Sequence, residues 1–226
     1  MLTASLLAVA LLGGVCARAQ QPVPVFPPNA DVQPEHDCCG AITPEGIRLA
    51  QLIDSMDVEH LWRADTFVDW KTGKTEHMEG HSTHCSAFAA AVGYRLNVYM
   101  LRPPEHRTLY LASAQVHWFS SRQAHRDGWR AVVSQAKAQR LANRGSLVVI
   151  GYATEAGDED AHGHIVVVRP AVKTNAQLSV EGPQVAQAAN RNRSSDAAAN
   201  SFHSHPGAWP NKVQYFAHAV DWNSVK

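Results

Sequence analysis

The apolar positions of the chain fall into two patterns, which change near residue 145. The first part has apolar residues at helical spacing or in alanine-rich runs. These patterns predict helices over 44–56, 85–101, 105–121 and 127–142. The second part has short β-branched runs, which predict strands over 146–153, 164–169 and, more weakly, 184–189 and 212–220. Because helices precede strands without βαβ alternation, we expect an α+β fold with an antiparallel sheet in a single domain.

Local signals mark the ends of the predicted helices. Thr43 and Pro44 are typical of an N-cap followed by the first helical position. The sequence Arg102-Pro103-Pro104 is expected to end the alanine-rich helix, because proline breaks the helical hydrogen-bond pattern. Gly145 is expected to end the last helix.

Three segments have neither a helical nor a strand period. Residues 57–84 are polar and irregular, and three aromatic side chains are expected to anchor them in the core: Trp62, Phe67 and Trp70. Residues 155–160 form an acidic, glycine-containing loop between two predicted strands. Residues 190–200 (NRNRSSDAAAN) are predicted to be a polar surface loop.

The N-terminal segment has the features of a targeting signal. Residues 2–15 are apolar and uncharged, but too short to cross a bilayer comfortably as a helix. They precede Ala17-Arg18-Ala19, an A-x-A-like cleavage pattern. We therefore predict a signal peptide over 1–19, cut after Ala19, and a secreted or periplasmic protein. A lipoprotein with Cys16 as the lipidated residue is the alternative.

The rest of the chain is expected to contain a leader and one domain. Residues 20–42 are rich in proline and are predicted to be extended. Residues 43–226 then form the domain. The other apolar runs are short, so no integral membrane segment is expected after signal cleavage.

Composition narrows the function classes. Twenty Lys and Arg balance twenty Asp and Glu, so the net charge of zero provides no electrostatic reason to expect a nucleic-acid partner. The 45% hydrophobic fraction excludes a wholly disordered chain. Signal cleavage leaves three cysteines, and an odd number leaves one thiol over in an oxidising compartment. Cys38 and Cys39 either pair with each other or have other partners, and Cys85 is the expected free thiol.

Two short motifs carry candidate chemistry. Cys85 begins the alanine-rich helix, where the helix dipole and the free backbone N–H groups favour a thiolate and can face an oxyanion. Gly163 and His164 begin a β-branched strand, and the glycine permits a close approach. A nucleophile at a helix start with a histidine on the adjacent strand is the geometry of a Cys–His pair. Taken alone, a buried cysteine is more often an inert small hydrophobe.

These motifs resemble those of a known superfamily. HCSAFAAAV resembles the D-C-S-G-hydrophobic helix start of NlpC-type cell-wall peptidases and CHAP amidases, and GHIVVV resembles their G-H-V-hydrophobic strand. The order of the cysteine helix, the histidine strand and a polar residue on the next strand is also theirs. The sequence departs from them at His84, where Asp or Asn is common, and at Ala87, where Gly is usual.

The resemblance implies a papain-like α+β core and a secreted cysteine hydrolase. It would cleave amide bonds of peptidoglycan stem peptides, as an endopeptidase or an amidase, with no cofactor. Cys85 would be the nucleophile and His164 the base. The family's third residue orients the imidazole from the following strand, where Gln187 is the first choice and Asn190 the second.

Other residues are expected near this site. Ser86, His84 and His162 are candidates for the oxyanion site or the cleft, and His162 is also an alternative base. A non-catalytic module that binds cell-wall peptides on the same fold is the alternative function.

Two histidine clusters raise a third possibility, a zinc metallohydrolase. The first cluster consists of Glu76, His77, Glu79, His81, His84 and Cys85. Its spacings match no paired zinc motif, so no metal is expected there. The second, His203-Ser204-His205-Pro206, is similar to the H-S-H-P of JAMM-type metalloproteases. The Ser and Asp that follow in those enzymes are replaced by Val213 and Phe216, so we interpret this match as a coincidence.

Overall fold

The structure is a computed structural model. It describes residues 38–63, 67–76, 85–106, 110–154, 162–189 and 191–225. The predicted signal peptide and most of the predicted leader lie outside these ranges. So do Asn190 and the histidines of the first cluster, His84 among them.

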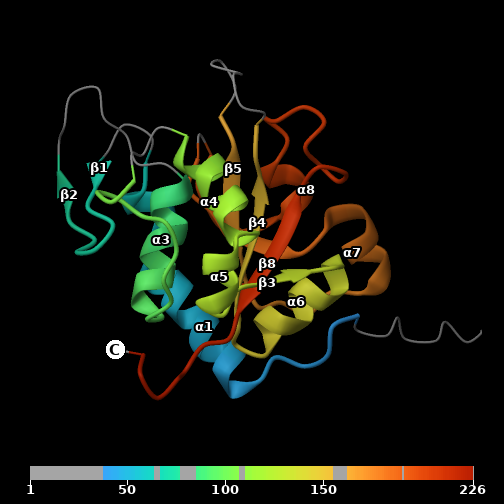
Figure 1. Ribbon diagram of the computed structural model, residues 1–226. Helices are drawn as coiled ribbons and strands as arrows, with labels where there is room; N and C mark the ends of the chain where they lie inside the picture. Colours follow the sequence, from blue (N-terminus) through green and yellow to red (C-terminus); the bar gives the residue numbers. More distant parts are fainter. Residues whose placement is uncertain are drawn as a thin grey trace, which may run out of the picture. The chain divides into compact units, whose positions relative to one another are not determined.

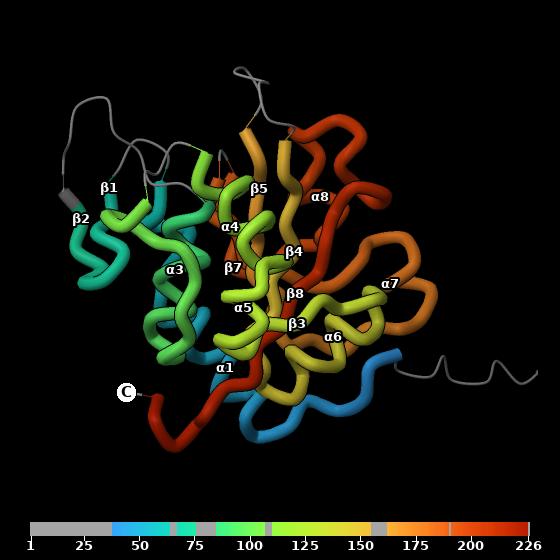
Figure 2. Tube along the Cα trace, in the orientation of Figure 1, coloured from blue at the N-terminus to red at the C-terminus, as the bar shows by residue number. Residues whose placement is uncertain are grey.

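Six strands form one antiparallel sheet in the order β3-β8-β4-β5-β6-β7. The strands are β3 (Arg130–Val132), β4 (Leu147–Tyr152), β5 (His164–Val168), β6 (Gln184–Gln187), β7 (Arg193–Ala197) and β8 (Gln214–His218). A short hairpin, β1 (Phe67–Val68) and β2 (Thr75–Glu76), stands apart from this sheet. The C-terminal strand β8 lies between β3 and β4, which come from the middle of the chain (Figure 2). The expected α+β class with an antiparallel sheet is confirmed.

Helices cover both faces of the sheet. They are α1 (Pro44–Ser55), α2 (Val58–Leu61), α3 (Cys85–Arg95), α4 (Leu111–Phe119), α5 (Arg122–Arg126), α6 (Gln135–Asn143), α7 (Asn175–Glu181) and α8 (Ala198–Ser201). In Figure 1, α1 and α3 lie on one side of the sheet, and α6 and α7 lie on the other. None of the helices in the described ranges is both long enough and apolar enough to span a bilayer.

The strand alternation divides the core into two clusters. Successive side chains of a strand point to opposite faces of the sheet. Ile165 and Val167 pack with residues of α1, α3 and α4, whereas Val166 and Val168 pack with residues of α6 and α8. All four side chains are 0% exposed. A continuous apolar run in β5 therefore reflects a strand buried on both faces.

Two predicted helix boundaries are wrong: the end of the alanine-rich helix and the start of the helix that follows it. The helix α3 ends at Arg95 rather than at residue 101, because Asn97 has a left-handed backbone (φ 55°) that stops the helical pattern. The next helix begins at Leu111 rather than at residue 105. Ser121 then caps a separate short helix, α5, by accepting a hydrogen bond from Ala124 N–H at 3.1 Å.

The predicted helix over 127–142 is also wrong in its first part. Residues 130–132 form the edge strand β3, which pairs with Tyr215–Ala217 of β8. The helix α6 begins only after Ser134, whose side chain accepts from Lys137 N–H at 3.2 Å. Pairing with a strand that is far away in sequence overrides the local helical preference here.

The C-terminal half contains more regular structure than the sequence analysis expected. Residues 190–200 contain strand β7 and the start of helix α8 instead of a surface loop. The unpredicted helix α7 follows Thr174, which forms a capping box with Gln177. That Thr-x-x-Gln spacing is a recognised helix-start signal in the sequence.

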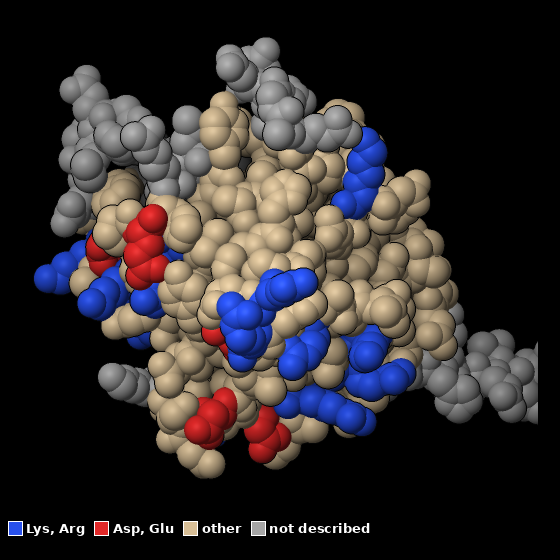
Figure 3. Space-filling view, in the orientation of Figure 1, with Lys and Arg blue, Asp and Glu red and all other residues tan. Residues whose placement is uncertain are grey.

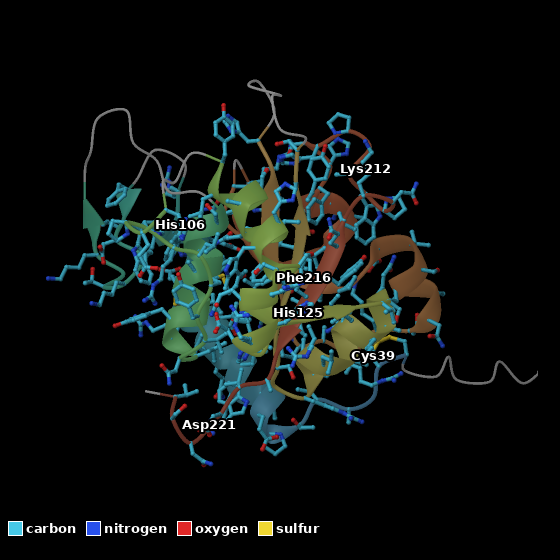
Figure 4. The ribbon with its side chains drawn as sticks, viewed as in Figure 1. Cys39, His106, His125, Lys212, Phe216 and Asp221 are labelled. Atoms are coloured by element: carbon cyan, nitrogen blue, oxygen red, sulfur yellow. A yellow bond between two sulfur atoms is a disulfide. The ribbon has the colours of Figure 1, made fainter. Side chains whose placement is uncertain are left out.

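The structure also tests the predictions for the aromatic anchors and for the cysteines. Trp62 is buried, and its indole N–H donates to the backbone carbonyl of Met56 at 3.0 Å. Phe67 and Trp70 are only partly buried. Cys38 and Cys39 form a disulfide, which was the first of the two alternatives, and Cys85 is free (Figure 4).

The net charge is zero, but the charged side chains are unevenly distributed over the surface. Figure 3 shows Lys and Arg side chains gathered on the face that α5, β3 and α6 form. The exposed basic residues of these elements and their ends are Arg122, Arg126, Arg130, Lys137, Arg140 and Arg144. A net charge of zero therefore conceals a local excess of basic side chains on this face.

Candidate active site

Cys85 is the first residue of α3 and is 9% exposed. Its Sγ interacts with the backbone N–H groups of Ile165, Ser86 and Cys85 itself, which favour the thiolate. Burial acts in the opposite direction and is the larger effect, so the pKa of the thiol is raised to about 11. The predicted support from the helix start is present, but desolvation outweighs it.

His164 and Gln187 are brought together on neighbouring strands. The imidazole Nε2–H donates to Oε1 of Gln187 at 3.1 Å, in the tautomer that leaves Nδ1 as an acceptor. Both side chains are buried, with exposed fractions of 2% and 4%. Strand alternation puts His164 on the face of Val166 and Val168, the face that α6 and α8 cover.

The imidazole of His164 is held in its neutral form. Burial lowers its pKa to about 4, and repulsion from the nearby His205 acts in the same direction. The hydrogen bond to Gln187 opposes both effects, because it favours the protonated ring. At neutral pH the ring is therefore able to accept a proton.

The thiol of Cys85 and the imidazole of His164 lie on opposite faces of the sheet at β5. Helix α3 packs against the face of Ile165, whereas the ring of His164 projects from the opposite face. The Sγ atom of Cys85 reaches the strand at the backbone N–H of Ile165, the residue that follows His164. Within the described parts of the chain, no hydrogen bond joins this thiol directly to the imidazole. Catalytic hydrogen bonds are often longer before substrate binds.

Two aromatic rings contact the imidazole of His164. The ring of His205 is nearly parallel to it, with centroids 5.1 Å apart and an interplanar angle of 10°. The ring of Phe202 meets it edge-on at 5.3 Å. Both residues belong to the C-terminal segment after β7. The sequence analysis missed their place at the site, although it had singled out the H-S-H-P motif that contains His205.

Gly163 permits a close approach, as predicted, but to α4 and β4. A Cβ atom at this position would lie 2.4 Å from Oγ of Ser113, 3.0 Å from its backbone nitrogen and 2.6 Å from the carbonyl of Tyr152. Ser113 Oγ also accepts from the backbone N–H of Thr154 at 3.2 Å. A side chain at residue 163 would therefore displace the start of β5, which carries His164.

The remaining predicted site residues differ in their surroundings. Ser86 is 1% exposed, and its backbone carbonyl accepts from the amide of Gln115 at 3.1 Å. His162 is exposed and stacks on Tyr110, with ring centroids 5.3 Å apart.

The described ranges contain no group of three or more His, Cys, Asp or Glu residues placed to hold a metal ion. His205 stacks against His164, and His203 is exposed. The histidines of the first cluster lie outside these ranges, so the structure does not test that zinc alternative.

No protein-family model matches the chain, and no curated protein matches it either. Function is therefore inferred from the residues of the site. Two observations carry most weight: the buried His164–Gln187 hydrogen bond, and the contact of the Cys85 thiol with the backbone N–H of Ile165 on the same strand.

Proposed function

We propose that the protein is a secreted or periplasmic cysteine hydrolase with a papain-like core, which cleaves amide bonds of peptidoglycan stem peptides. One observation carries the proposal. Gln187 accepts from Nε2–H of His164, so the ring presents Nδ1 as an acceptor, while the thiol of Cys85 contacts the next backbone amide of the same strand. A nucleophile, a base and an orienting amide are the three parts that such a reaction needs.

The protonation states support transfer of the thiol proton during attack. The pKa of Cys85 is raised to about 11 and that of His164 is lowered to about 4, both chiefly by burial. At neutral pH the resting pair is therefore a thiol and a neutral imidazole. A preformed thiolate–imidazolium pair would require the opposite order of pKa values.

The proposed reaction has two stages. The reaction requires substrate binding to bring Sγ of Cys85 and Nδ1 of His164 within hydrogen-bonding distance. Nδ1 then takes the proton from Sγ as a bond forms between Sγ and the amide carbon. The carbon–nitrogen bond then breaks, and the imidazolium returns that proton to the leaving amine. In the second stage a water molecule, deprotonated by His164, attacks the thioester, and Sγ leaves to recover its proton. The products are a carboxylic acid and an amine.

The start of α3 provides donors for the oxyanion. The first N–H groups of a helix have no partner within that helix, and they carry the positive end of its dipole. Those of Cys85 and Ser86 already lower the pKa of the thiol, so they act on negative charge at this position. An oxyanion formed on the attacked carbonyl would be stabilised by the same groups.

The substrate class comes from the sequence. The helix and strand motifs resemble those of cell-wall peptidases and amidases, and the predicted signal peptide directs the protein out of the cytosol. The resemblance and the predicted signal peptide together favour a cell-wall peptide as the substrate.

The test is mass spectrometry of purified peptidoglycan after incubation with the protein or with its Cys85→Ala variant. We expect new muropeptide fragments from the wild type alone, with activity lowered by at least about 10³-fold in the variant. The masses of the fragments identify the bond. Fragments from both proteins would remove Cys85 from the mechanism.

A non-catalytic peptide-binding module is the second candidate. The 9% exposure and the raised pKa of Cys85 favour it, because a reactive thiol is normally accessible and acidic. Binding of muropeptides by the wild type and by Cys85→Ala, without new fragments across several wall chemistries, would support this function. The rate of iodoacetamide alkylation at Cys85, compared with a free model thiol, measures the reactivity directly.

A further inference from the structure

We propose that His205 is a positioning residue, which holds the imidazole of His164 in the orientation that its hydrogen bond to Gln187 requires. The nearly parallel stack of the two imidazoles carries this inference. It deepens the proposed function and rests on it for the kinetic readout only.

A single hydrogen bond does not define the plane of an imidazole. The bond from Nε2 of His164 to Gln187 leaves the ring free to turn about its own side-chain torsions. A flat ring stacked at 5.1 Å and 10° restricts that turn, and the edge of Phe202 adds a second contact. The described hydrogen bonds of His164 include no other side-chain partner.

His205 is itself fixed at both ends. Its Nδ1 lies 3.2 Å from Oγ of Ser204, and the backbone of His162 is close enough to raise the pKa of its ring. His162 and His164 are two residues apart, at the start of β5. One side chain therefore ties the C-terminal segment to the start of this strand at two points.

The titratable groups that face His205 can be named from each neighbouring element. They are His164 and His162 at β5, and Tyr152 of β4, whose ring lies edge-on at 5.9 Å. The charge of a protonated His162 lowers the pKa of His205. Burial lowers the pKa of His205, so its ring is largely neutral at pH 7. The repulsion that lowers the pKa of His164 acts only when His205 is itself protonated, so a neutral His205 positions its neighbour without it.

The test uses the full-length protein with labelled histidines and measures the ring nitrogens of His164 by NMR. We expect one tautomer, Nε2–H, in the wild type. His205→Ala should give a mixture of tautomers and a raised pKa of His164, and His205→Phe should restore the single tautomer because it keeps a flat ring. His203→Ala is the matched control, since His203 is an exposed histidine of the same segment.

The kinetic arm uses muropeptide cleavage. His205→Ala should lower kcat about tenfold with little change in KM, since misplacement of a base affects the chemical step. His205→Phe should recover most of that loss. Cleavage by His205→Ala at the wild-type rate would overturn the inference.

The two arms distinguish two failures. If His164 keeps one tautomer and its pKa in His205→Ala, the positioning role is wrong, whatever the activity. If the NMR changes occur but even the wild type cleaves nothing, the positioning role holds and the proposed hydrolase is wrong. Should the alanine variant fail to fold, His205→Leu, which keeps bulk without a flat ring, provides the same comparison.

Discussion

Two buried polar clusters on the same sheet differ in how completely their hydrogen-bonding groups are used. In the first, Gln139 and Asn143 of α6 are both 0% exposed, and every amide group of the two side chains has a partner. The other partners are backbone groups of Gly40, Arg169, Ala171 and Gln184. This cluster joins the N-terminal segment to the sheet.

The second cluster, the His164–Gln187 pair, has one hydrogen bond. Among the residues that the structure describes, Nδ1 of His164 has no hydrogen-bond partner. Buried polar groups in proteins are nearly always paired, because an unpaired one costs free energy. A fully paired cluster is typical of a structural role, whereas a histidine that keeps an acceptor nitrogen without a hydrogen bond is typical of a reactive site.

The largest effect is expected in the structural cluster. Asn143→Ala removes the side-chain partner of backbone groups at Gly40 and Ala171 and one of the two acceptors of the Gln139 amide. We therefore expect a loss of roughly 3 kcal/mol in the free energy of unfolding. Chemical denaturation measures it, with Asn200→Ala as the exposed control. The folded Asn143→Ala protein should cleave muropeptides at the wild-type rate. A loss of rate without a loss of stability would contradict the structural role of this cluster.

The reactive site, unlike the structural cluster, should make stability depend on pH. The folded protein binds the proton of Cys85 more tightly than the unfolded chain does, so this contribution is present below roughly pH 8.5 and is lost as the pH rises to about 11. The pKa of His164 is lowered, so its contribution is present above roughly pH 6.5 and is lost as the pH falls to about 4.

Each contribution is on the order of 3 kcal/mol. Denaturation measured from pH 4 to pH 11 should therefore show a plateau between these limits. Cys85→Ala should flatten the alkaline side of the curve, and His164→Gln the acid side. Unchanged slopes in these variants would show that other groups determine the pH dependence. Asn143→Ala should lower the whole curve without changing its shape, since that side chain does not titrate.

The smallest effect is expected for the orienting amide. Gln187→Ala should lower kcat/KM about tenfold, because His164 loses the acceptor that selects its tautomer. Gln184→Ala on the same strand is the matched control, since its side chain bonds Ser195 and not His164. Equal rates in the two variants would remove Gln187 from the site. If Gln187→Ala lowered the free energy of unfolding as much as Asn143→Ala does, the role of Gln187 would be structural.

The predictions from sequence succeeded where a signal is local. Thr43 and Pro44 begin α1 as expected, and its Thr43 Oγ1 accepts from Gly46 N–H at 3.3 Å. The runs before and after the acidic loop form β4 and β5. The choice of Gln187 placed an amide where His164 needs a partner.

The predictions failed where a residue's structure or contacts depend on a segment far away in the sequence. Residues 130–132 read as part of a helix, but they pair with β8, about eighty residues later in the chain. The motif around His205 gave no local reason to expect a ring stacked on His164, because that contact depends on how the segment after α8 folds back over β5. The support that the helix start gives to a thiolate was visible in the sequence, whereas the burial that outweighs it was not.

The sequence by itself determined the α+β class, the free cysteine at a helix start, the histidine at a strand start and the amide 23 residues after that histidine. Each of these depends on residue type and on spacing along the backbone. The tertiary structure alone decided the strand order, the protonation states of Cys85 and His164, the stack of His205 and the one-sided basic face. Desolvation, ring contacts and summed charge depend on which segments become neighbours in space, and periodicity along a chain does not contain that information.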